Sequence, residues 1–303
     1  MKRYIYTIEP MTEEEKREFV QKCEETFEKQ LEFAAQKIME NGSKIITLSG
    51  PTCSGKTTTA MRLISLIEKS GKRVGVISID DFYKSREILN AESKSRGLSS
   101  VDYDSAMSID LDYFEKCIDG ILADKKVMLP VYSFEHGKRL NYYEFDSKKY
   151  SFIILEGIQA VYPEITGHIH TGFKSVQISV ARDVEVNGST FTSRQIRFLR
   201  RMVRDAKFRN APTQITFEMW GSVSENEDLH IFPYERKCDI QIDSYMEYEL
   251  FMMKKEVLTL LSDIGKDNEY YSKAEEIREK MSRIFEISAE YLPELSVYHE
   301  FLG

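Results

Sequence analysis

The chain has 303 residues, of which 42% are hydrophobic, and a formal net charge of −8. This length suffices for one large α/β domain with additions or for two modest domains, and the negative charge argues against a nucleic-acid surface as the main binding surface. No stretch approaches the roughly 18 apolar residues of a membrane span, and the first ten residues lack the apolar core of a signal peptide. The four cysteines form no C-x-x-C pair, which argues against a zinc site and a disulfide framework. We therefore expect a cytoplasmic protein that binds neither a membrane nor nucleic acid.

The first predicted element is one long amphipathic helix. Thr12 and Glu15 have the spacing of a capping box, and apolar residues then recur at helical spacing until Asn41-Gly42. The apolar residues in question are Phe19, Cys23, Phe27, Leu31, Ala34 and Ile38. We expect residues 1–42 to form a helical extension whose apolar stripe packs on the rest of the chain or on another subunit, which leaves a homo-oligomer open.

Residues 50–57, Gly-Pro-Thr-Cys-Ser-Gly-Lys-Thr, match the phosphate-binding pattern G-x-x-x-x-G-K-[S/T] in full. An apolar strand pattern precedes the motif and a helical pattern follows it, which is the required order; a chance glycine-rich turn is the alternative. Backbone N–H groups would surround an anion at the start of the helix, Lys56 would add positive charge near the β- and γ-phosphates, and Thr57 would be a ligand of Mg²⁺. The candidate ATP-binding residues of this loop are Gly50, Thr52, Cys53, Ser54, Gly55, Lys56, Thr57 and Thr58.

A second strand is predicted at residues 72–80, and it ends in two acids, Asp80 and Asp81. Open parallel sheets bind ligands at the carboxyl ends of their strands, so these acids stand where a substrate is expected. Adjacent side chains cannot point the same way, which predicts one carboxylate facing the phosphates and the other facing solvent. A simple acidic cap of a turn or helix is the alternative.

The next stretch predicts a loop, a helix and a hairpin. Residues 84–103, rich in Ser, Lys and Arg, have the composition of a mobile loop, and Asp104 separates them from a helix at 108–123. Residues 127–134 and 139–145 predict two strands joined by a turn that contains glycine. Three polar side chains are expected to cluster near one end of this hairpin: Tyr132, His136 and Arg139.

A continuous apolar run at residues 150–155 predicts a central parallel strand, and it delivers Glu156 at its carboxyl end. A carboxylate in that place is a second candidate, beside Thr57, to hold Mg²⁺ or its water shell. His168 and His170 have no third ligand in the sequence, so we interpret them as polar residues at a strand edge rather than a metal pair.

Four arginines share one stripe of a helix predicted over residues 190–209. They are Arg194, Arg197, Arg201 and Arg204. Guanidinium groups bind phosphate oxygens in pairs, so this pattern fits a lid, at about residues 190–212, that closes over a transferring phosphoryl group and excludes water. A basic face in solvent, or arginines paired with the surplus acids of the chain, is the equal alternative.

The remaining elements complete an α/β pattern. A helix at 212–223 contains Trp220, which we expect to be a core residue, and a strand follows at 238–244. Helices are predicted at 247–263 and 272–288. We predict a three-layer α/β fold with a mainly parallel central sheet, a small β-hairpin and a helical lid. Its expected units are the extension 1–42, a phosphate-loop domain 43–245 and the C-terminal helices 246–303 that pack on it.

Several motifs in this order resemble the uridine kinase and phosphoribulokinase family of P-loop kinases, within which the chain is similar to a bacterial branch of uridine or nucleoside kinases. The resemblance covers roughly residues 44–245. It is carried by the phosphate loop and by Ser78–Lys84, Tyr103-Asp104, Pro130–Phe134 with Arg139, Ile154–Gly157 and Arg200–Asp205 with Arg209.

The family resemblance implies a reaction and roles for individual residues. The reaction is transfer of a phosphoryl group from ATP, with Mg²⁺, to the 5′-hydroxyl of a nucleoside-like small molecule in pyrimidine salvage. Asp80 would be the base that takes the hydroxyl proton, and Lys56 and Arg201 would be the other catalytic residues. Arg201 and Arg209 would also bind ATP phosphates, and Thr57 and Glu156 would bind Mg²⁺ or its water shell. The substrate-binding residues would be Asp80, Tyr83, Asp104, Tyr132, His136, Arg139 and Arg204.

The sequence also departs from the family pattern. Gly137 stands where uridine kinases have a histidine that helps to read the pyrimidine, with His136 one residue early, and Ala211 replaces a lid arginine. The acceptor therefore stays open between uridine or cytidine and another small-molecule alcohol, as in phosphoribulokinases. A nucleotide-binding regulator without turnover is a third hypothesis, and retention of an acceptor-side base counts against it.

Overall fold

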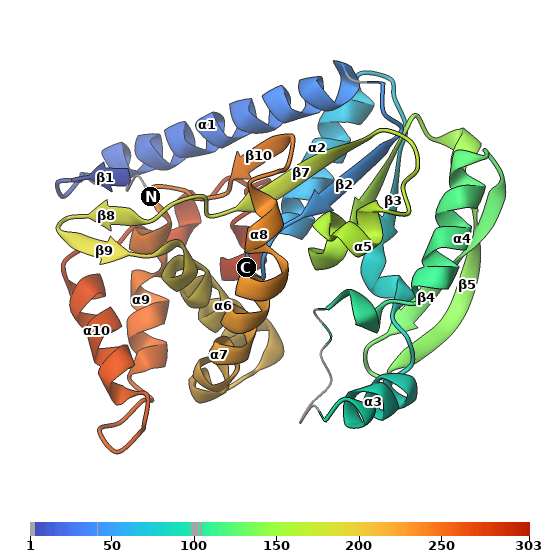
Figure 1. Ribbon diagram of the computed structural model, residues 1–303. Helices are drawn as coiled ribbons and strands as arrows, with labels where there is room; N and C mark the ends of the chain where they lie inside the picture. Colours follow the sequence, from blue (N-terminus) through green and yellow to red (C-terminus); the bar gives the residue numbers. More distant parts are fainter. Residues whose placement is uncertain (1–3, 41, 98–102, 104) are drawn as a thin grey trace.

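A computed structural model describes residues 4–40, 42–97, 103 and 105–303 of the protein (Figure 1). Its centre is a five-stranded, all-parallel sheet. The strands lie in the order β10 (Ile240–Asp243), β7 (Phe173–Ser179), β2 (Ile45–Ser49), β6 (Phe152–Glu156) and β3 (Val74–Ser78). Every residue of β2 is buried, as expected for a parallel strand covered on both faces.

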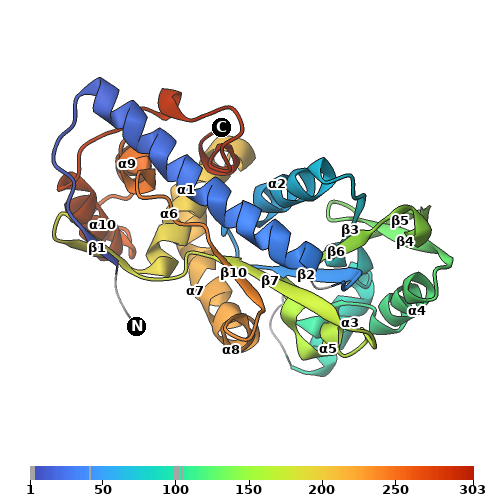
Figure 2. The same ribbon diagram turned by 90° about the horizontal axis from the view of Figure 1, so that it is seen from above.

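Helices cover both faces of this sheet, so the predicted three-layer α/β fold is confirmed. On one face lie α1 (Glu13–Glu40) and α2 (Lys56–Lys69), which pack against each other (Figures 1 and 2). The other face is covered by α4 (Leu111–Leu122), the short helix α5 (Pro163–Thr166) and the 3₁₀ turn η4 (Ile158–Val161). Alternate strand residues serve the two layers: Ile46 joins the α1/α2 core and Ile45 the opposite one.

The long N-terminal helix forms as its sequence predicts. Thr12 and Glu15 form the capping box, with the Thr12 N–H 2.7 Å from a Glu15 carboxylate oxygen and the Glu15 N–H 3.3 Å from the Thr12 hydroxyl. Before it, β1 (Tyr4–Tyr6) pairs with β8 (Val184–Val186), which pairs in turn with β9 (Ser189–Phe191). A small second sheet thus joins the start of the chain to the region before residue 193.

The hairpin also forms, from β4 (Lys126–Ser133) and β5 (Lys138–Asp146), but the loop predicted before it is wrong in part. Residues 86–95 are a helix, α3 (Arg86–Ser95), whose N-cap is Ser85. The Arg86 N–H donates to the Gly137 carbonyl at 2.7 Å, so this helix starts against the hairpin turn. Because that tertiary contact stabilises the first turn, composition alone did not reveal the helix.

The remaining helices gather at one end of the sheet. They are α6 (Ser193–Arg209), α7 (Thr213–His230), α8 (Phe232–Glu235), α9 (Glu249–Leu261), α10 (Tyr271–Ser282) and α11 (His299–Leu302), with 3₁₀ turns η1 (Ile79–Phe82), η2 (Ala106–Ser108), η3 (Ser147–Lys149) and η5 (Ala289–Tyr291) elsewhere. The helix predicted at 212–223 extends to His230, and the one predicted to 288 ends at Ser282. α6 packs against α7, α9 and α11. Within the described residues, every helix is too short or too polar to cross a membrane.

Candidate phosphoryl-transfer site

The phosphate loop lies between β2 and α2, at the carboxyl end of the sheet. At Gly50 a Cβ atom would stand 2.3 Å from the carbonyl oxygen of Ile178, so only glycine fits. Gly55, the N-cap of α2, has φ of +83°, in the left-handed region that glycine adopts without strain. Cys53 is buried, and burial raises the pKa of its thiol, so it is a structural rather than a reactive cysteine.

Lys56, the first residue of α2, pairs with Glu156. Its Nζ lies 3.2 Å from Glu156 Oε1, and both side chains are largely buried. In the sheet register Glu156 stands opposite Leu48 of β2 and Ser78 of β3, so these strands bring their carboxyl ends together. Thr57 is the next residue of the helix. A hydroxyl and one carboxylate beside a phosphate cradle fit Mg²⁺, which keeps several waters and few protein ligands.

Two further carboxylates bind donors of the phosphate loop, and sequence reasoning missed both. Glu227 of α7 accepts the Thr52 N–H at 3.3 Å. Glu300 of α11 accepts the Thr58 hydroxyl at 2.8 Å and the Thr58 N–H at 3.4 Å. These acids lie about 175 and 242 residues away in the chain, so no local pattern could have revealed the contacts.

The two acids after β3 take different roles. Asp80 lies in η1, two residues beyond the position that pairs with Glu156, and is partly buried. Asp81 accepts the backbone N–H of Tyr132 at 2.9 Å, and partial burial raises the pKa of its carboxyl. The second carboxylate therefore holds the hairpin in place and does not simply face solvent, which corrects the expectation for this pair.

An aromatic cluster lies beside η1, on the side of the sheet opposite α2. The Tyr83 ring contacts Tyr103, Tyr132 and Phe134, with centroids 5.9, 5.5 and 5.8 Å away. Phe134, which the sequence did not single out, is 59% exposed and so presents a ring that a ligand can reach. Asp104, also predicted to bind substrate, lies outside the described residues.

Gln159 is a second residue that the sequence analysis missed. Its side chain is fully buried and donates to the Tyr83 hydroxyl at 3.0 Å and to the Tyr103 carbonyl at 3.2 Å. The Tyr83 hydroxyl in turn donates to the same carbonyl at 2.9 Å. The hydroxyl of Tyr83 therefore points into the protein interior, and its ring contacts the other rings of the aromatic cluster.

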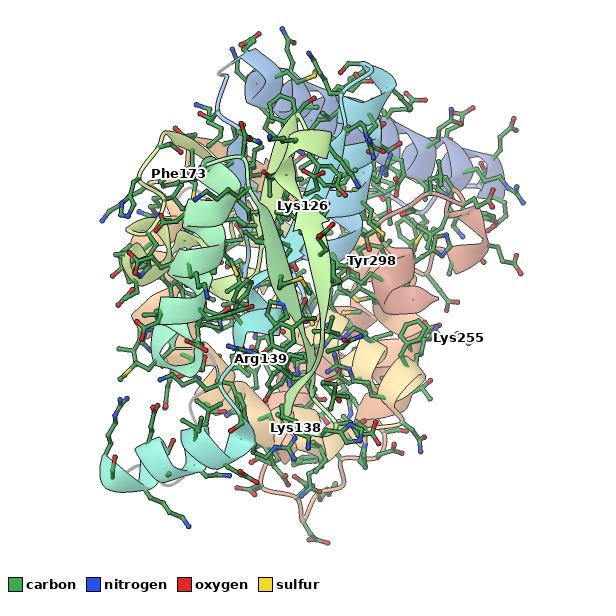
Figure 3. The ribbon with its side chains drawn as sticks, turned by 90° about the vertical axis from the view of Figure 1, so that its right-hand side faces the viewer. Lys126, Lys138, Arg139, Phe173, Lys255 and Tyr298 are labelled. Atoms are coloured by element: carbon green, nitrogen blue, oxygen red, sulfur yellow. The ribbon has the colours of Figure 1, made fainter. Side chains whose placement is uncertain are left out.

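The hairpin runs along the face seen in Figure 3, from Lys126 to Lys138, with α4 beside it. Arg139, labelled near the end of the hairpin in Figure 3, donates to Asp110 at 2.9 Å and to the Phe82 carbonyl at 2.8 Å. His136 is exposed and bonds Ser133 of its own turn at 3.0 Å. The polar residues predicted near this end thus lie there, with Arg139 bound to the fold.

The arginines of α6 are paired with acids in this structure. Asp205 is the common partner of Arg201, Arg204 and Arg209, at 3.2, 2.9 and 3.3 Å. The other two of the stripe bind α7: Arg194 with Asp228 at 2.7 Å and Arg197 with Glu227 at 2.6 Å. Of the two alternatives for this stripe, phosphate binding by a lid and pairing with acids, the structure without a ligand shows the pairing with acids.

Arg200, fully buried, links α6 to the phosphate loop and to α9. It donates to the Cys53 carbonyl at 3.2 Å, to the Ser244 carbonyl at 2.7 Å and to Glu249 at 2.6 Å. Burial raises the pKa of the Glu249 carboxyl to about 7, against the opposing attraction of Arg200. The helix predicted as a lid therefore contacts the phosphate loop directly.

The space left between α6, α7 and the phosphate loop is small. A cavity of about 80 Å³ is lined by Thr52, Ile158, Arg201 and Glu227, with neighbours on α7. Ligand pockets usually measure about 300–1,000 Å³, so this cavity by itself is too small to hold a nucleotide.

Two residues outside this site have structural roles. Trp220 packs its ring on Phe198, with centroids 5.4 Å apart, in agreement with the expected core role. His168 lies 3.3 Å from Glu115, and no group of three metal-ligating side chains occurs within the described residues.

Comparison with known proteins gives a family match over most of the chain. The sequence profile described as "Phosphoribulokinase / Uridine kinase family" matches residues 45–250. A curated uridine kinase from Ureaplasma parvum serovar 3 is 28% identical over 199 residues, which cover 65% of this chain and 86% of that protein. One from Schizosaccharomyces pombe is 38% identical over 125 residues, 40% of this chain and 26% of that protein.

A solved structure shares the fold. The YGR205w protein superposes with a TM-score of 0.52 at 16% identity, covering 72% of this chain and 96% of that one.

Proposed function

Because the chain belongs to the phosphoribulokinase and uridine kinase family, we propose that it transfers the γ-phosphoryl group of ATP, with Mg²⁺, to the 5′-hydroxyl of uridine or cytidine. One observation carries the proposal. The phosphate loop follows β2 and the Asp80 turn follows β3, with the carboxyl end of β6 between them, and an aromatic cluster adjoins the turn. Such a protein would act in pyrimidine salvage in the cytoplasm.

In this proposal Asp80 accepts the proton of the attacking hydroxyl. Lys56 binds the β- and γ-phosphate oxygens after leaving Glu156, and the loop N–H groups hold the remaining charge. Glu156 and Thr57 would hold Mg²⁺, which neutralises charge on the phosphates when bound. Phosphoryl transfer needs little covalent chemistry from the protein, so positioning and positive charge supply most of the rate.

The arginines of α6 would change partners when substrates bind. Arg201 and Arg209 now bind Asp205 and would turn to ATP phosphates, and Arg204 to the acceptor. Tyr132 and Phe134 would stack the base, with Asp104 and His136 as polar contacts. Because Asp205 is buried and these three arginines are its ion-pair partners, at least one of them would stay with Asp205 when the others turn to the substrates.

Another small-molecule alcohol is the second candidate acceptor, and one contact favours it. Arg139 is bound to Asp110 and the Phe82 carbonyl, and so offers fewer free donors to a pyrimidine than its place in the hairpin suggests. The kinase mechanism would be the same with either acceptor.

The test is ATP consumption with Mg²⁺ across uridine, cytidine, other nucleosides, ribulose 5-phosphate and pantothenate, with Asp80→Asn as the control. We expect turnover of a pyrimidine nucleoside that falls about 10²- to 10⁴-fold in Asp80→Asn. ATP affinity should be nearly unchanged, because the substitution removes only the carboxylate that accepts the hydroxyl proton. Turnover of a different alcohol would transfer the assignment to that acceptor. Near-normal turnover in the variant would show that Asp80 is not the catalytic base. No ATP consumption with any acceptor would favour a nucleotide-binding regulator.

A further inference from the structure

A carboxylate of the protein itself, that of Glu300, binds the start of α2. The first N–H groups of a helix have no acceptor within the helix, and here the first intrahelical bond runs from Thr59 to Gly55. The Thr58 N–H instead donates to Glu300, which also accepts the Thr58 hydroxyl at 2.8 Å. A carboxylate thus binds the kind of donors, at the positive end of a helix, that attract phosphate oxygens.

Glu300 is held in that position by the helix that carries the arginine stripe. Lys207 of α6 donates to the Leu302 carbonyl at 2.8 Å. The Arg200 guanidinium lies over the Phe301 ring at 5.0 Å, and Phe301 borders Gly55 of the phosphate loop. The contact between Glu300 and α2 is therefore part of a packed unit, with Phe301 and Leu302 both buried.

We propose that Glu300 is a built-in competitor for the phosphate groups of the nucleotide, and that a nucleotide must displace it from Thr58 to bind fully. The two anions cannot share the same N–H and hydroxyl donors, and they repel each other. The free energy of separating Glu300 from Thr58 is subtracted from the free energy of nucleotide binding. α11 also packs on α6, which carries the arginines proposed to bind the phosphates.

This inference rests on the nucleotide half of the proposed function and is independent of the acceptor. The test measures binding of inorganic tripolyphosphate and of ATP to the full chain by calorimetry, without added metal. Glu300→Gln removes the charge and keeps the side-chain shape. Glu294→Gln is the matched control, because it removes the same charge from an exposed glutamate of the same segment.

We expect Glu300→Gln to bind both ligands about tenfold more tightly than wild type, because a hydrogen bond to a charged group no longer opposes them, and Glu294→Gln to match wild type. Equal or weaker binding by Glu300→Gln overturns the proposal, and so does equal tightening in both variants, which would indicate a general charge effect. If none of the three proteins binds either ligand, the nucleotide site and this inference fail together. If all bind alike, only this inference fails.

Discussion

At the scale of single residues, the proposed acceptor site depends on a buried amide. Gln159 donates hydrogen bonds to the Tyr83 hydroxyl and the Tyr103 carbonyl from the protein interior. It therefore orients the Tyr83 ring without reaching the surface itself. A residue of this kind acts through its neighbour, and its removal should alter acceptor binding more than nucleotide binding.

We predict that Gln159→Leu, close in volume, raises the KM for the acceptor about three- to tenfold, the effect of one or two lost neutral hydrogen bonds, and leaves the KM for ATP unchanged. Steady-state kinetics with each substrate varied checks this. Gln177→Leu, at a second buried glutamine on β7, is the control and should leave both KM values alone. An equal rise in both KM values for Gln159→Leu would indicate general misfolding instead.

At the scale of elements, two neighbouring ion pairs join α6 to α7 and differ in burial and in the number of their hydrogen bonds. Arg197 and Glu227 are almost fully buried, with side-chain exposures of 2% and 3%, whereas Arg194 and Asp228 are 34% and 58% exposed. Removing one member of a buried pair leaves an uncompensated charge, which water cannot solvate.

We predict that Glu227→Gln lowers the free energy of unfolding by about 3–5 kcal/mol and that Asp228→Asn changes it by less than about 1 kcal/mol. Denaturant unfolding of both variants under the same buffer conditions gives the comparison. Similar losses in the two variants would contradict the role of burial. A much smaller loss in Glu227→Gln would mean that α7 is held mainly by its apolar contacts.

The elements also show what the sequence could and could not predict. The phosphate loop, the Thr12 capping box and the hairpin were predictable because each depends on residues close together in the chain. Helix α3 was missed because its first turn is fixed by Gly137, about 50 residues away. The acids at the phosphate loop, Glu227 and Glu300, were missed for the same reason, since only the fold brings them to Thr52 and Thr58.

At the scale of the whole molecule, α1 crosses from the small sheet at β1 to the central sheet and packs on α2 (Figure 2). Its buried Glu24 accepts hydrogen bonds from Tyr248 and Ser296, both at 2.5 Å. Leu31 is fully buried in the same core, whereas Phe33 on the opposite side of the helix is 59% exposed. The helix thus contributes to the core and also presents an apolar residue to solvent.

We predict that Leu31→Ala lowers the free energy of unfolding by about 2–5 kcal/mol, because it leaves a cavity in the core. Phe33→Ala should change it by no more than about 0.5 kcal/mol, since a surface side chain makes few contacts. Thermal or denaturant unfolding of the two variants measures both. A small effect of Leu31→Ala would show that residues 13–40 are only loosely attached.

The two cores on either side of the sheet have a consequence for how such a protein diversifies. The phosphate loop residue Cys53 packs in one core with α1 and the C-terminal helices, and Tyr83 and Tyr132 pack in the other with α4 and the hairpin. Changes in the second core would therefore alter the proposed acceptor site and leave the packing of the phosphate loop in place. In laboratory evolution, libraries confined to the Tyr83 side of the sheet should therefore yield new acceptor preferences with the least loss of ATP affinity.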